Sequence, residues 1–517
     1  MKKLLFALVF PIVSFSQSFN IKDYGAIADG KTINTAPIQK AIDACNSKGG
    51  GTVVVPTGTF ISGTLFLKSH VNLEVQQGGI LKGSNNLADY EVEGKKYGLI
   101  YASDCENISL TGEGEINGNG SFFMNFNRIH NFIDYDRKYI RQGESFLANE
   151  TIIGDGPVAY VARPSMMIMI FHSERVKIKD LHLVDTPEWN IRLSECENVQ
   201  CTGLTIRSNL SIPNSDGIHC TTSRNVIISN CDIQGGDDAI IVSGFGDESG
   251  VGGYTEKVVV KSYQFGNKTK IAENVTVTNC ILLSRSAAIR IGYGFNSIRN
   301  LIFSNLIIYN SNRGIGIFCR DDARIENISF TDIHIECRLH TGKWWGRGEP
   351  IHISSVRQSG TKKLGGISRI RFSNIRINQA EAGIVVFGSE DSKIEDIDFQ
   401  DIDLTLQNGP LVESYGGNFD MRPSSDKSTA LFKHDIPAFH ARQVKNLSIK
   451  NYRLKWKDSI PATYFTNGFY AENFENINLE KIKIAGAKKD IPAIFLRSGR
   501  GLSIDNSAVL SGLKINK

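Results

Sequence analysis

The chain repeats one pattern of apolar and polar positions over most of its length. Each unit opens on a polar pair that usually contains Asn, continues as a strand with alternating apolar side chains, passes a turn residue and ends in a second alternating strand. Examples are ERVKIKDLHLV, ENVTVTNCILL, ENISFTDIHIE and ENINLEKIKIA. Alternation with a period of two is typical of strands with one buried face. The pattern therefore predicts pairs of short strands, repeated many times.

The Asn of the opening pair returns at a fixed interval. It stands at positions 198, 225, 274, 300 and 327, so three of the four gaps are 26 or 27 residues long. The fourth gap is 49 residues long and contains an insertion around residues 244–272. A fixed period of short strands with polar turns indicates a solenoid, in which each coil packs on its neighbours.

The type of solenoid follows from the pattern within each unit. The L-x-x-L-x-L-x-x-N pattern of leucine-rich repeats is absent, and no linker-like stretch divides the series into separate β-sandwich domains. Alternation across both strands of a unit favours a parallel β-helix instead. We therefore predict an all-β fold, a parallel β-helix that forms a single domain over residues 17–517.

Near the N-terminus the pattern changes to that of a short helix. Asn34 or Thr35 is expected to cap this helix, and Pro37 lies in its first turn. The apolar residues that fit one helical face are Ile38, Ala41, Ile42 and Cys45. Glycines at 49–51 end the helix before a strand begins. A helix placed here would cover the open end of the stack, where unpaired strand backbone invites aggregation.

Four segments depart from the repeat and are predicted to be long loops: residues 119–162, 244–272, 338–350 and 406–440. Long loops on a rigid stack usually form a binding face. The third loop contains Trp344 and Trp345. Their rings either stack on sugar rings or attach the loop to the coil, and the pattern leaves both possibilities open.

The first residues, MKKLLFALVFPIVSFSQ, have the pattern of a secretory signal peptide. Two lysines precede an apolar run that is too short to span a bilayer, and small residues follow it. We expect residues 1–16 to be removed and the protein to be exported, to the periplasm or the extracellular space. The chain has nine Cys. A large fold needs no disulfide staples, so we expect these residues to be buried and stacked in the core.

Charge and hydropathy narrow the choice of partners. The formal net charge is only +4, and no basic run alternates with aromatic residues, so nucleic acid is not an expected partner. Beyond the N-terminus, no apolar stretch is long enough for a membrane helix. We expect a monomer that needs neither a cofactor nor a metal ion.

Three aspartates lie at matching positions of neighbouring units. Asp216 lies in PNSDGIHC, and Asp237 and Asp238 lie in GGDDAIIV, 21 and 22 residues later. If one coil takes about that many residues, the three carboxylates stack on one face. Stacked carboxylates repel one another, which raises the pKa of at least one of them and makes it a proton donor. Inverting glycoside hydrolysis needs such an acid and carboxylates that activate water; calcium binding is the alternative use.

Several motifs resemble those of glycoside hydrolase family 28, the polygalacturonase family of right-handed parallel β-helices. The similar segments cover most of the mature chain: YGAIADG, GGGTVVVPTGTF, RPSMMIMIFHSERVKI, PEWNIRLSECENV, NSDGI and GGDDAI. The last two correspond to the N-x-D and D-D motifs of the family. The resemblance implies that Asp237 is the general acid and that Asp216 and Asp238 hold the attacking water. It gives Asn214 a supporting role beside the substrate.

Two other motifs of the family are lost. Its Gly-His-Gly falls on Ser286-Ala287-Ala288, and its Arg-Ile-Lys falls on Gly316-Ile317-Phe318. In the family, the lost Arg and Lys hold the carboxylate of a galacturonate. We expect Arg290 and Arg320 to replace them, because both follow the lost motifs closely. Further candidate cations are His219, His352, Arg192 and Arg313.

The sequence therefore predicts a secreted hydrolase of α-glycosidic bonds in a pectin-like acidic polysaccharide, with an inverting three-aspartate mechanism and exo-action. Three alternatives remain open at this point. The lost cations favour a related hydrolase of a neutral or sulfated sugar. The same scaffold can carry a β-elimination lyase that uses Ca²⁺ and a basic residue. The lost His also fits a non-catalytic, glycan-binding β-helix.

Overall fold

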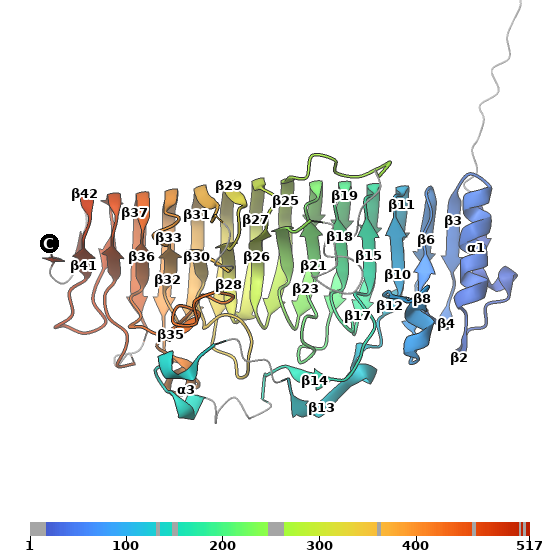
Figure 1. Ribbon diagram of the computed structural model, residues 1–517, viewed down its shortest axis with the longest axis horizontal. Coiled ribbons are helices and arrows are strands. Elements are labelled where there is room, and N and C mark those ends of the chain that lie inside the picture. The colour runs from blue at the N-terminus through green and yellow to red at the C-terminus, as the bar shows by residue number, and fades with distance from the viewer. Residues whose placement is uncertain are drawn as a thin grey trace, which may run out of the picture.

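The computed structural model describes residues 17–130, 135–146, 154–246, 263–358, 363–457, 462–505, 508–509 and 513–516. The predicted signal peptide lies outside the described residues. The described chain forms a long stack of coils whose strands pair in parallel with those of the next coil (Figure 1). The prediction of a parallel β-helix is confirmed. No helix among the described residues has the length and apolar composition needed to cross a bilayer.

One sheet of 14 strands runs along the stack and carries the candidate site, so we call it the site sheet. Its strands are β5 (Leu65–Phe66), β10 (Ile100–Ser103), β15 (Ile168–Phe171), β18 (Ile191–Ser194), β21 (Ile218–Thr221), β24 (Ile240–Gly244), β26 (Ala287–Gly294), β28 (Arg313–Cys319), β30 (Ile351–Ser355), β32 (Ile384–Phe387), β36 (Phe439–Arg442), β38 (Phe469–Glu472), β41 (Ile494–Arg497) and β44 (Leu513–Asn516). Each coil adds one strand to this sheet.

A second sheet of 24 strands forms the remainder of each coil. Its strands are β1 (Ser18–Asn20), β2 (Asp29–Ile33), β3 (Gly51–Val55), β4 (Gly58–Ser62), β6 (Val71–Val75), β7 (Gly79–Gly83), β11 (Glu106–Thr111), β12 (Glu115–Asn117), β16 (Glu174–Lys179), β17 (His182–Val184), β19 (Glu197–Thr202), β20 (Thr205–Arg207), β22 (Arg224–Ser229), β23 (Asp232–Gly235), β25 (Ala272–Ser284), β27 (Ile298–Ser311), β29 (Arg324–Cys337), β31 (Gly366–Ala380), β33 (Ile394–Leu406), β37 (Val444–Trp456), β39 (Glu475–Glu480), β40 (Lys483–Ile484), β42 (Arg500–Asp505) and β43 (Ala508–Val509).

Smaller elements belong to the cap and the loops. They are the α-helices α1 (Thr35–Ser47) and α3 (Val412–Tyr415), the 3₁₀ helices η1 (Ile21–Tyr24), η2 (Leu87–Tyr90), η3 (Gly120–Phe123) and η4 (Arg137–Tyr139), and the antiparallel pairs β8 (Glu91–Val92) with β9 (Lys95–Lys96), β13 (Met124–Ile129) with β14 (Val158–Tyr160), and β34 (Asn418–Asp420) with β35 (Leu431–Lys433).

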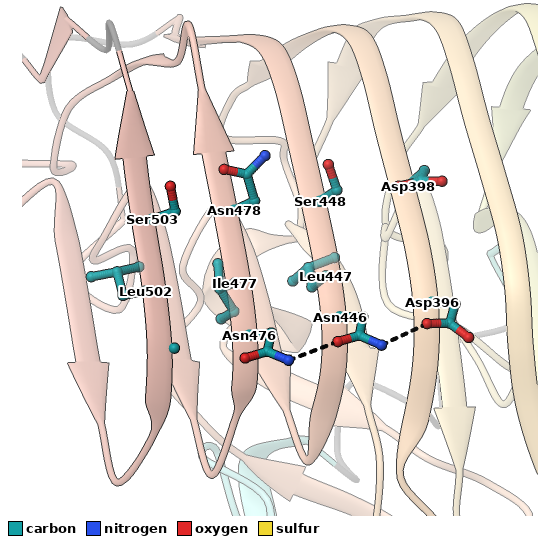
Figure 2. Close-up of a pocket in the computed structure, with 11 residues that line it drawn as sticks. Asp396, Asp398, Asn446, Leu447, Ser448, Asn476, Ile477, Asn478, Leu502 and Ser503 are labelled. Carbon is teal, nitrogen blue, oxygen red and sulfur yellow. Dashed lines mark hydrogen bonds between the residues drawn. The ribbon is translucent and has the colours of Figure 1, made fainter.

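The repeated Asn residues occupy left-handed bends of the coil. At positions 198, 225, 274, 300 and 327 the backbone φ lies between 54° and 57°. Each amide Nδ2 donates to Oδ1 of the preceding Asn, over 3.1, 3.0, 3.2 and 2.7 Å along the series. Figure 2 shows a later part of this kind of ladder, in which Asn476 donates to Asn446 and Asn446 donates to Asp396. Asn adopts this conformation more readily than other residues with a side chain, so the sequence period is the period of these bends.

One continuous hydrophobic core fills the stack from Ile21 to Leu496. Equivalent residues of successive coils lie on top of one another. The clearest case is a stack of four nearly parallel Phe rings with centroids 4.9, 4.8 and 4.7 Å apart: Phe303, Phe330, Phe372 and Phe399. All nine Cys are buried and none forms a disulfide, which confirms that they serve as core residues.

Helix α1 covers the first coil, as predicted (Figure 1). The four residues predicted for its buried face are all buried. Gln39 pairs with the backbone of Phe66 in β5: its Nε2 donates to the carbonyl at 3.0 Å, and its Oε1 accepts from the amide at 2.8 Å. The prediction that Asn34 or Thr35 caps the helix is confirmed for Asn34, although its side chain makes no hydrogen bond to the helix. Asn34 is the N-cap residue, but its side chain bonds the backbone of Ile27 and Thr32.

Most insertions leave the stack at one corner, just before a strand of the site sheet begins. This holds for the segments before β15, β30, β36 and β38. The insertions before β15 and β36 meet over the outer face of β32 and form a second hydrophobic cluster, which includes Phe146, Tyr415, Phe419, Val385 and Phe387. The loops therefore build a wall on one part of the site sheet.

Candidate active site

The three predicted aspartates lie at the corner where the site sheet begins. Ile218 pairs with Ile240 across β21 and β24, and each strand is preceded two residues earlier by an acid, Asp216 or Asp238. The backbone between them is fixed, because the Gly217 amide donates to the Asp238 carbonyl at 2.9 Å. Asp216 and Asp238 are therefore stacked on neighbouring coils. Two of the three predicted acids, Asp216 and Asp238, thus lie in matching positions of neighbouring coils.

Asp238 is held by two donors. Its Oδ1 accepts from the Ala287 amide at 2.9 Å, and its Oδ2 forms an ion pair with Nε of Arg290. Both side chains of this pair are 7 % exposed. A buried carboxylate is stable only when a cation or hydrogen bonds compensate its charge. Asp238 has both.

The other two carboxyls hold protons more tightly than usual. Burial, together with the charge of Asp238, raises the pKa of Asp237 from 3.8 to about 7. Burial and the charges of Asp237 and Asp238 raise the pKa of Asp216 well above its ordinary value. The Oδ1 of Asp216 is buried and accepts no hydrogen bond from any described residue. The cluster thus combines one compensated carboxylate with two carboxyls whose pKa values are raised.

Asp237 differs from its two neighbours in exposure. It is partly exposed, whereas Asp216 and Asp238 are buried. Its Oδ1 accepts from the Asp238 amide at 3.0 Å, and the Ser286 side chain also contributes a hydrogen bond that favours the charged form. An acid that donates a proton to a bound ligand must be accessible and protonated, and of the three carboxyls Asp237 meets both conditions.

Arg290 lies in the site, as the sequence predicted, but its partner is an acid of the protein. Besides the ion pair with Asp238, its guanidinium stacks 4.6 Å from the centroid of Tyr293, and its Nη1 donates to the Gly292 carbonyl at 3.4 Å. The strand register places Arg290 in the same outward-facing row of the site sheet as Arg192, His219 and Gly316. Contact with substrate stays a prediction for Arg290.

The position of the lost Lys is filled by an aromatic ring. Gly316 has no side chain, and a Cβ atom built there would lie 2.5 Å from the ring of Phe318. The guanidinium groups of Arg313 and Arg320 lie 4.9 and 5.1 Å from the centroid of that ring. Phe318 is buried, so this position supplies neither the cation of the family pattern nor an exposed ring.

Two predicted sugar-binding residues are placed in the interior. Arg320 is 1 % exposed and donates to the carbonyl of Val356 and to Ser354. Trp344 is 3 % exposed, and its Nε1 donates to the carbonyl of Asp155 at 2.7 Å. Neither side chain has a face open to a ligand, so we correct both assignments: Arg320 supports Phe318, and Trp344 attaches its loop to the insertion before β15.

The other two predicted residues lie at the rim of the site. Trp345 is partly exposed, and its ring centroid is 6.0 Å from that of Tyr293. Asn214 is exposed and accepts from Nη2 of Arg163 at 3.1 Å. Arg163 also donates to the carbonyls of Pro187 and Pro213, which joins the insertion to the turn that carries Asp216.

Asp155 links three segments around the site, and sequence reasoning missed it. Its carboxylate lies 3.3 Å from Arg285, 3.0 Å from Arg338 and 3.2 Å from His340. Arg285 directly precedes Ser286, the hydrogen-bonding partner of Asp237. No sequence signal could have found this contact, because Asp155 lies in an irregular loop far along the chain from its partners.

Trp189 and Glu188 were also missed, although their spacing held a signal. Trp189 precedes Asp216 by 27 residues, one full period of the coil. Its ring centroid lies 3.9 Å from that of His219, whose pKa is held well below its ordinary value by burial and by Arg290 and Arg192. Burial raises the pKa of Glu188, which also interacts with Asp216. The period thus pointed to Trp189, and Glu188 beside it adds a fourth acidic group to the three.

A shallow depression of about 630 Å³ lies elsewhere, on the outer face of β33, β37, β39 and β42 (Figure 2). It contains Asp396 and Asp398, but Asp396 accepts a ladder hydrogen bond from Asn446. None of its lining residues belongs to the acid cluster. Within the described part of the chain, no group of three or more His, Cys, Asp or Glu side chains is arranged to hold a metal ion.

Comparisons with known proteins identify a family and several relatives. Residues 45–336 match the family described as glycosyl hydrolases family 28. A probable polygalacturonase of Vitis vinifera is 25% identical over 336 residues, which cover 61% of this chain and 60% of the relative. The exo-poly-alpha-D-galacturonosidase of Dickeya chrysanthemi is 30% identical over 259 residues, which cover 44% of this chain and 42% of the relative. The match therefore spans about half the length of these curated relatives.

A solved structure shows the same fold. The hyperthermoactive exopolygalacturonase from Thermotoga maritima aligns with a TM-score of 0.58 at 18% identity, over 85% of this chain and 92% of that chain. The matched residues 45–336 contain the three aspartates and make up more than half of the 517 residues. The chain belongs to glycosyl hydrolases family 28.

Proposed function

We propose that this protein is an exported hydrolase that cleaves α-glycosidic bonds of an acidic, pectin-like polysaccharide with inversion at the anomeric carbon. The observation that carries the proposal is the acid cluster, in which an accessible, protonated Asp237 lies beside Asp216 and a compensated Asp238. The chain's family and the names of its relatives, several of them polygalacturonases, support the choice of substrate class.

The proposed reaction uses the cluster without a cofactor. Asp237 donates its proton to the glycosidic oxygen as the bond from that oxygen to the anomeric carbon breaks. Water attacks the same carbon from the opposite face and gives its proton to the pair Asp216 and Asp238. The products are two sugars with a hemiacetal of inverted configuration, and the enzyme regains its initial state when one proton returns to Asp237.

In this proposal Arg290 sets the charge of the two carboxyls that receive the proton of water, Asp216 and Asp238. Because its guanidinium compensates Asp238, one carboxylate of the pair remains available to accept the proton of water. The protein thereby replaces the lost His of the family with a cation three residues further along the chain.

The action proposed is exo. The insertions before β15 and β36 pack together on the outer face of the site sheet over β32, and in this proposal they block the path of the polymer on that side of the acids. A polysaccharide can then enter from one side only, which favours removal of sugars from one end of the chain.

A second candidate function follows from Phe318. Where the family pattern has an Arg and a Lys, this chain has Gly316 and the buried ring of Phe318, so neither position supplies a cation for a sugar carboxylate. Hydrolysis of a neutral or sulfated glycan is therefore the alternative.

One experiment tests both candidates. Wild type and Asp237→Asn are incubated with polygalacturonate, xylogalacturonan, rhamnogalacturonan, a neutral galactan and sulfated algal glycans. Reducing ends and product anomers are measured, the latter by proton NMR. We expect hydrolysis of an acidic pectic glycan by the wild type, with inverted anomer and loss of at least 10³-fold in the variant. Activity on the neutral or sulfated glycans alone would support the alternative substrate class. A product with retained anomeric configuration would contradict the inverting mechanism.

A further inference from the structure

The turn that leads into β26 places a serine beside the proposed acid. Only two residues, Arg285 and Ser286, connect the end of β25 to the start of β26. Ser286 is 2 % exposed, and its hydroxyl forms a hydrogen bond with the carboxylate of Asp237. In the family pattern this position is the first Gly of the lost Gly-His-Gly motif. The serine therefore adds a contact with the acid that a glycine cannot make.

Hydrogen bonds fix this turn relative to the two acids of the preceding coil. Ser284, the last residue of β25, donates through Oγ to the carbonyl of Asp237 at 2.7 Å. The same Oγ accepts from the amide of Ser286 at 2.9 Å. The next amide along the chain, that of Ala287, donates to Oδ1 of Asp238 at 2.9 Å. The backbone that carries the Ser286 hydroxyl is thus attached to both acids.

The other residue of the turn, Arg285, is held by the insertions. Its guanidinium lies 3.3 Å from the carboxylate of Asp155 and 2.9 Å from Nδ1 of His340. Asp155 belongs to the insertion before β15, and His340 to the insertion before β30. Both residues of the turn therefore have defined contacts, so the fold itself holds the Ser286 hydroxyl at Asp237 before any substrate binds.

The contact favours one protonation state of Asp237. An ionised carboxylate can only accept hydrogen bonds, so the hydroxyl of Ser286 donates to it. This bond lowers the pKa of Asp237, against burial and the charge of Asp238, which raise it. Two further charged groups, Asp216 and Arg290, also interact with Asp237. Ser286 differs from these charged neighbours because a single substitution removes its effect without changing the charge of the cluster.

We propose that Ser286 is a positioning residue that keeps Asp237 acidic enough to give its proton to the glycosidic oxygen. This inference rests on the proposed function, in which Asp237 is the general acid. A general acid works best when its pKa lies near the working pH, because it must hold a proton and still release it. Without the hydroxyl, Asp237 would stay protonated to higher pH and would be a weaker acid. Ser286 takes part in no bond-breaking step.

The pH profile of kcat/KM tests this role. Wild type, Ser286→Ala and Ser286→Gly are compared on the glycan of the panel above that the wild type hydrolyses. We expect the alkaline limb to move upward by about one pH unit and the plateau to fall about threefold to tenfold. Glycine stands here in the family pattern, so the second variant keeps the test valid if the first does not fold.

Ser284→Ala is the matched control for the pH profile. It removes a buried hydroxyl of the same segment, but one that contacts the carbonyl of Asp237 and not its carboxylate. This variant should leave the alkaline limb where it is in the wild type. A lower plateau with an unchanged limb in both Ser286 variants would overturn the inference, because a merely structural hydroxyl gives that result.

Urea denaturation separates this inference from the proposed function, because it needs no turnover. Ser286→Ala should lower the free energy of unfolding more at pH 9, where Asp237 is ionised, than at pH 4, where it is protonated. In the Asp237→Asn background the same substitution should cost the same at both pH values. That pattern supports the contact even if the wild type hydrolyses no glycan. An equal cost at pH 4 and pH 9 in the wild-type background would overturn the inference.

Discussion

Replacing Asp237 by Asn should abolish hydrolysis and, at the same time, stabilise the fold at neutral pH. Burial and the charge of Asp238 raise the pKa of Asp237 from 3.8 to about 7. The ionised form is thus less favourable in the folded protein than in the unfolded chain. Asn has nearly the same shape, can still accept the hydrogen bond from the Asp238 amide, and carries no charge.

The size and pH range of the gain in free energy of unfolding follow from the pKa of Asp237 in the unfolded and in the folded protein. The two values differ by about three pH units, and each unit corresponds to about 1.36 kcal/mol, so the upper limit is about 4 kcal/mol. Because Asp237 is partly exposed, solvent screening lowers the expected gain to about 2 to 4 kcal/mol. Below pH 4 the carboxyl is protonated in both states and the gain is absent. It grows between pH 4 and 7 and stays constant above pH 7.

Urea denaturation at pH 4, 6 and 8 measures this difference directly. The matched control is Asp398→Asn, which changes an exposed aspartate on the outer face of β33 and should show no gain that depends on pH. The reasoning is refuted if the free energy of unfolding of Asp237→Asn exceeds that of the wild type equally at pH 4 and pH 8, or falls below it at pH 8.

Three further predictions concern the same site and the core. Since Asp237 must be protonated to act, kcat/KM should fall about tenfold per pH unit above about pH 7, and a rising profile there contradicts its role as the acid. Asp155→Asn weakens the ion pairs with Arg285 and its neighbours and should raise KM about tenfold; a native KM contradicts the role of Asp155 in positioning the loops. Phe330→Ala removes a ring from the core stack and should lower the free energy of unfolding by about 3 to 5 kcal/mol in chemical denaturation. Phe122→Ala, at a side chain that is 57% exposed, should change it by less than about 0.5 kcal/mol, and equal effects of the two substitutions would contradict the packing argument.

The period of the sequence predicted the fold because each coil obeys local rules. A left-handed bend favours Asn, and alternation fixes which side chains enter the core. The same rules placed Asp216 and Asp238 in matching positions, so the acid cluster was predictable from spacing alone. Asn34 shows what local rules do not predict. Its side chain forms hydrogen bonds with the backbone of Ile27 and Thr32 and not with the helix that begins beside it.

The contacts of the loops could not be predicted, because no period relates them to the coils. The ion pairs of Asp155 join residues more than 120 positions apart along the chain. Trp344 is a second example, since only the structure decides between sugar contact and loop anchoring. Arg290 was located by its place in an apolar run, but the sequence did not reveal that its partner is Asp238.

The hydrogen bonds between Gln39 and the backbone of Phe66 have a consequence for aggregation. Strand β5 is the first strand of the site sheet, and the Gln39 side chain satisfies one of its amides and one of its carbonyls. Without it, these two groups would face solvent at the edge of a long regular sheet. Such an edge is a template on which the last coil of another molecule could dock, and repeated docking in one direction yields fibres. A single glutamine thus helps to prevent this repeat protein from stacking end to end with other copies.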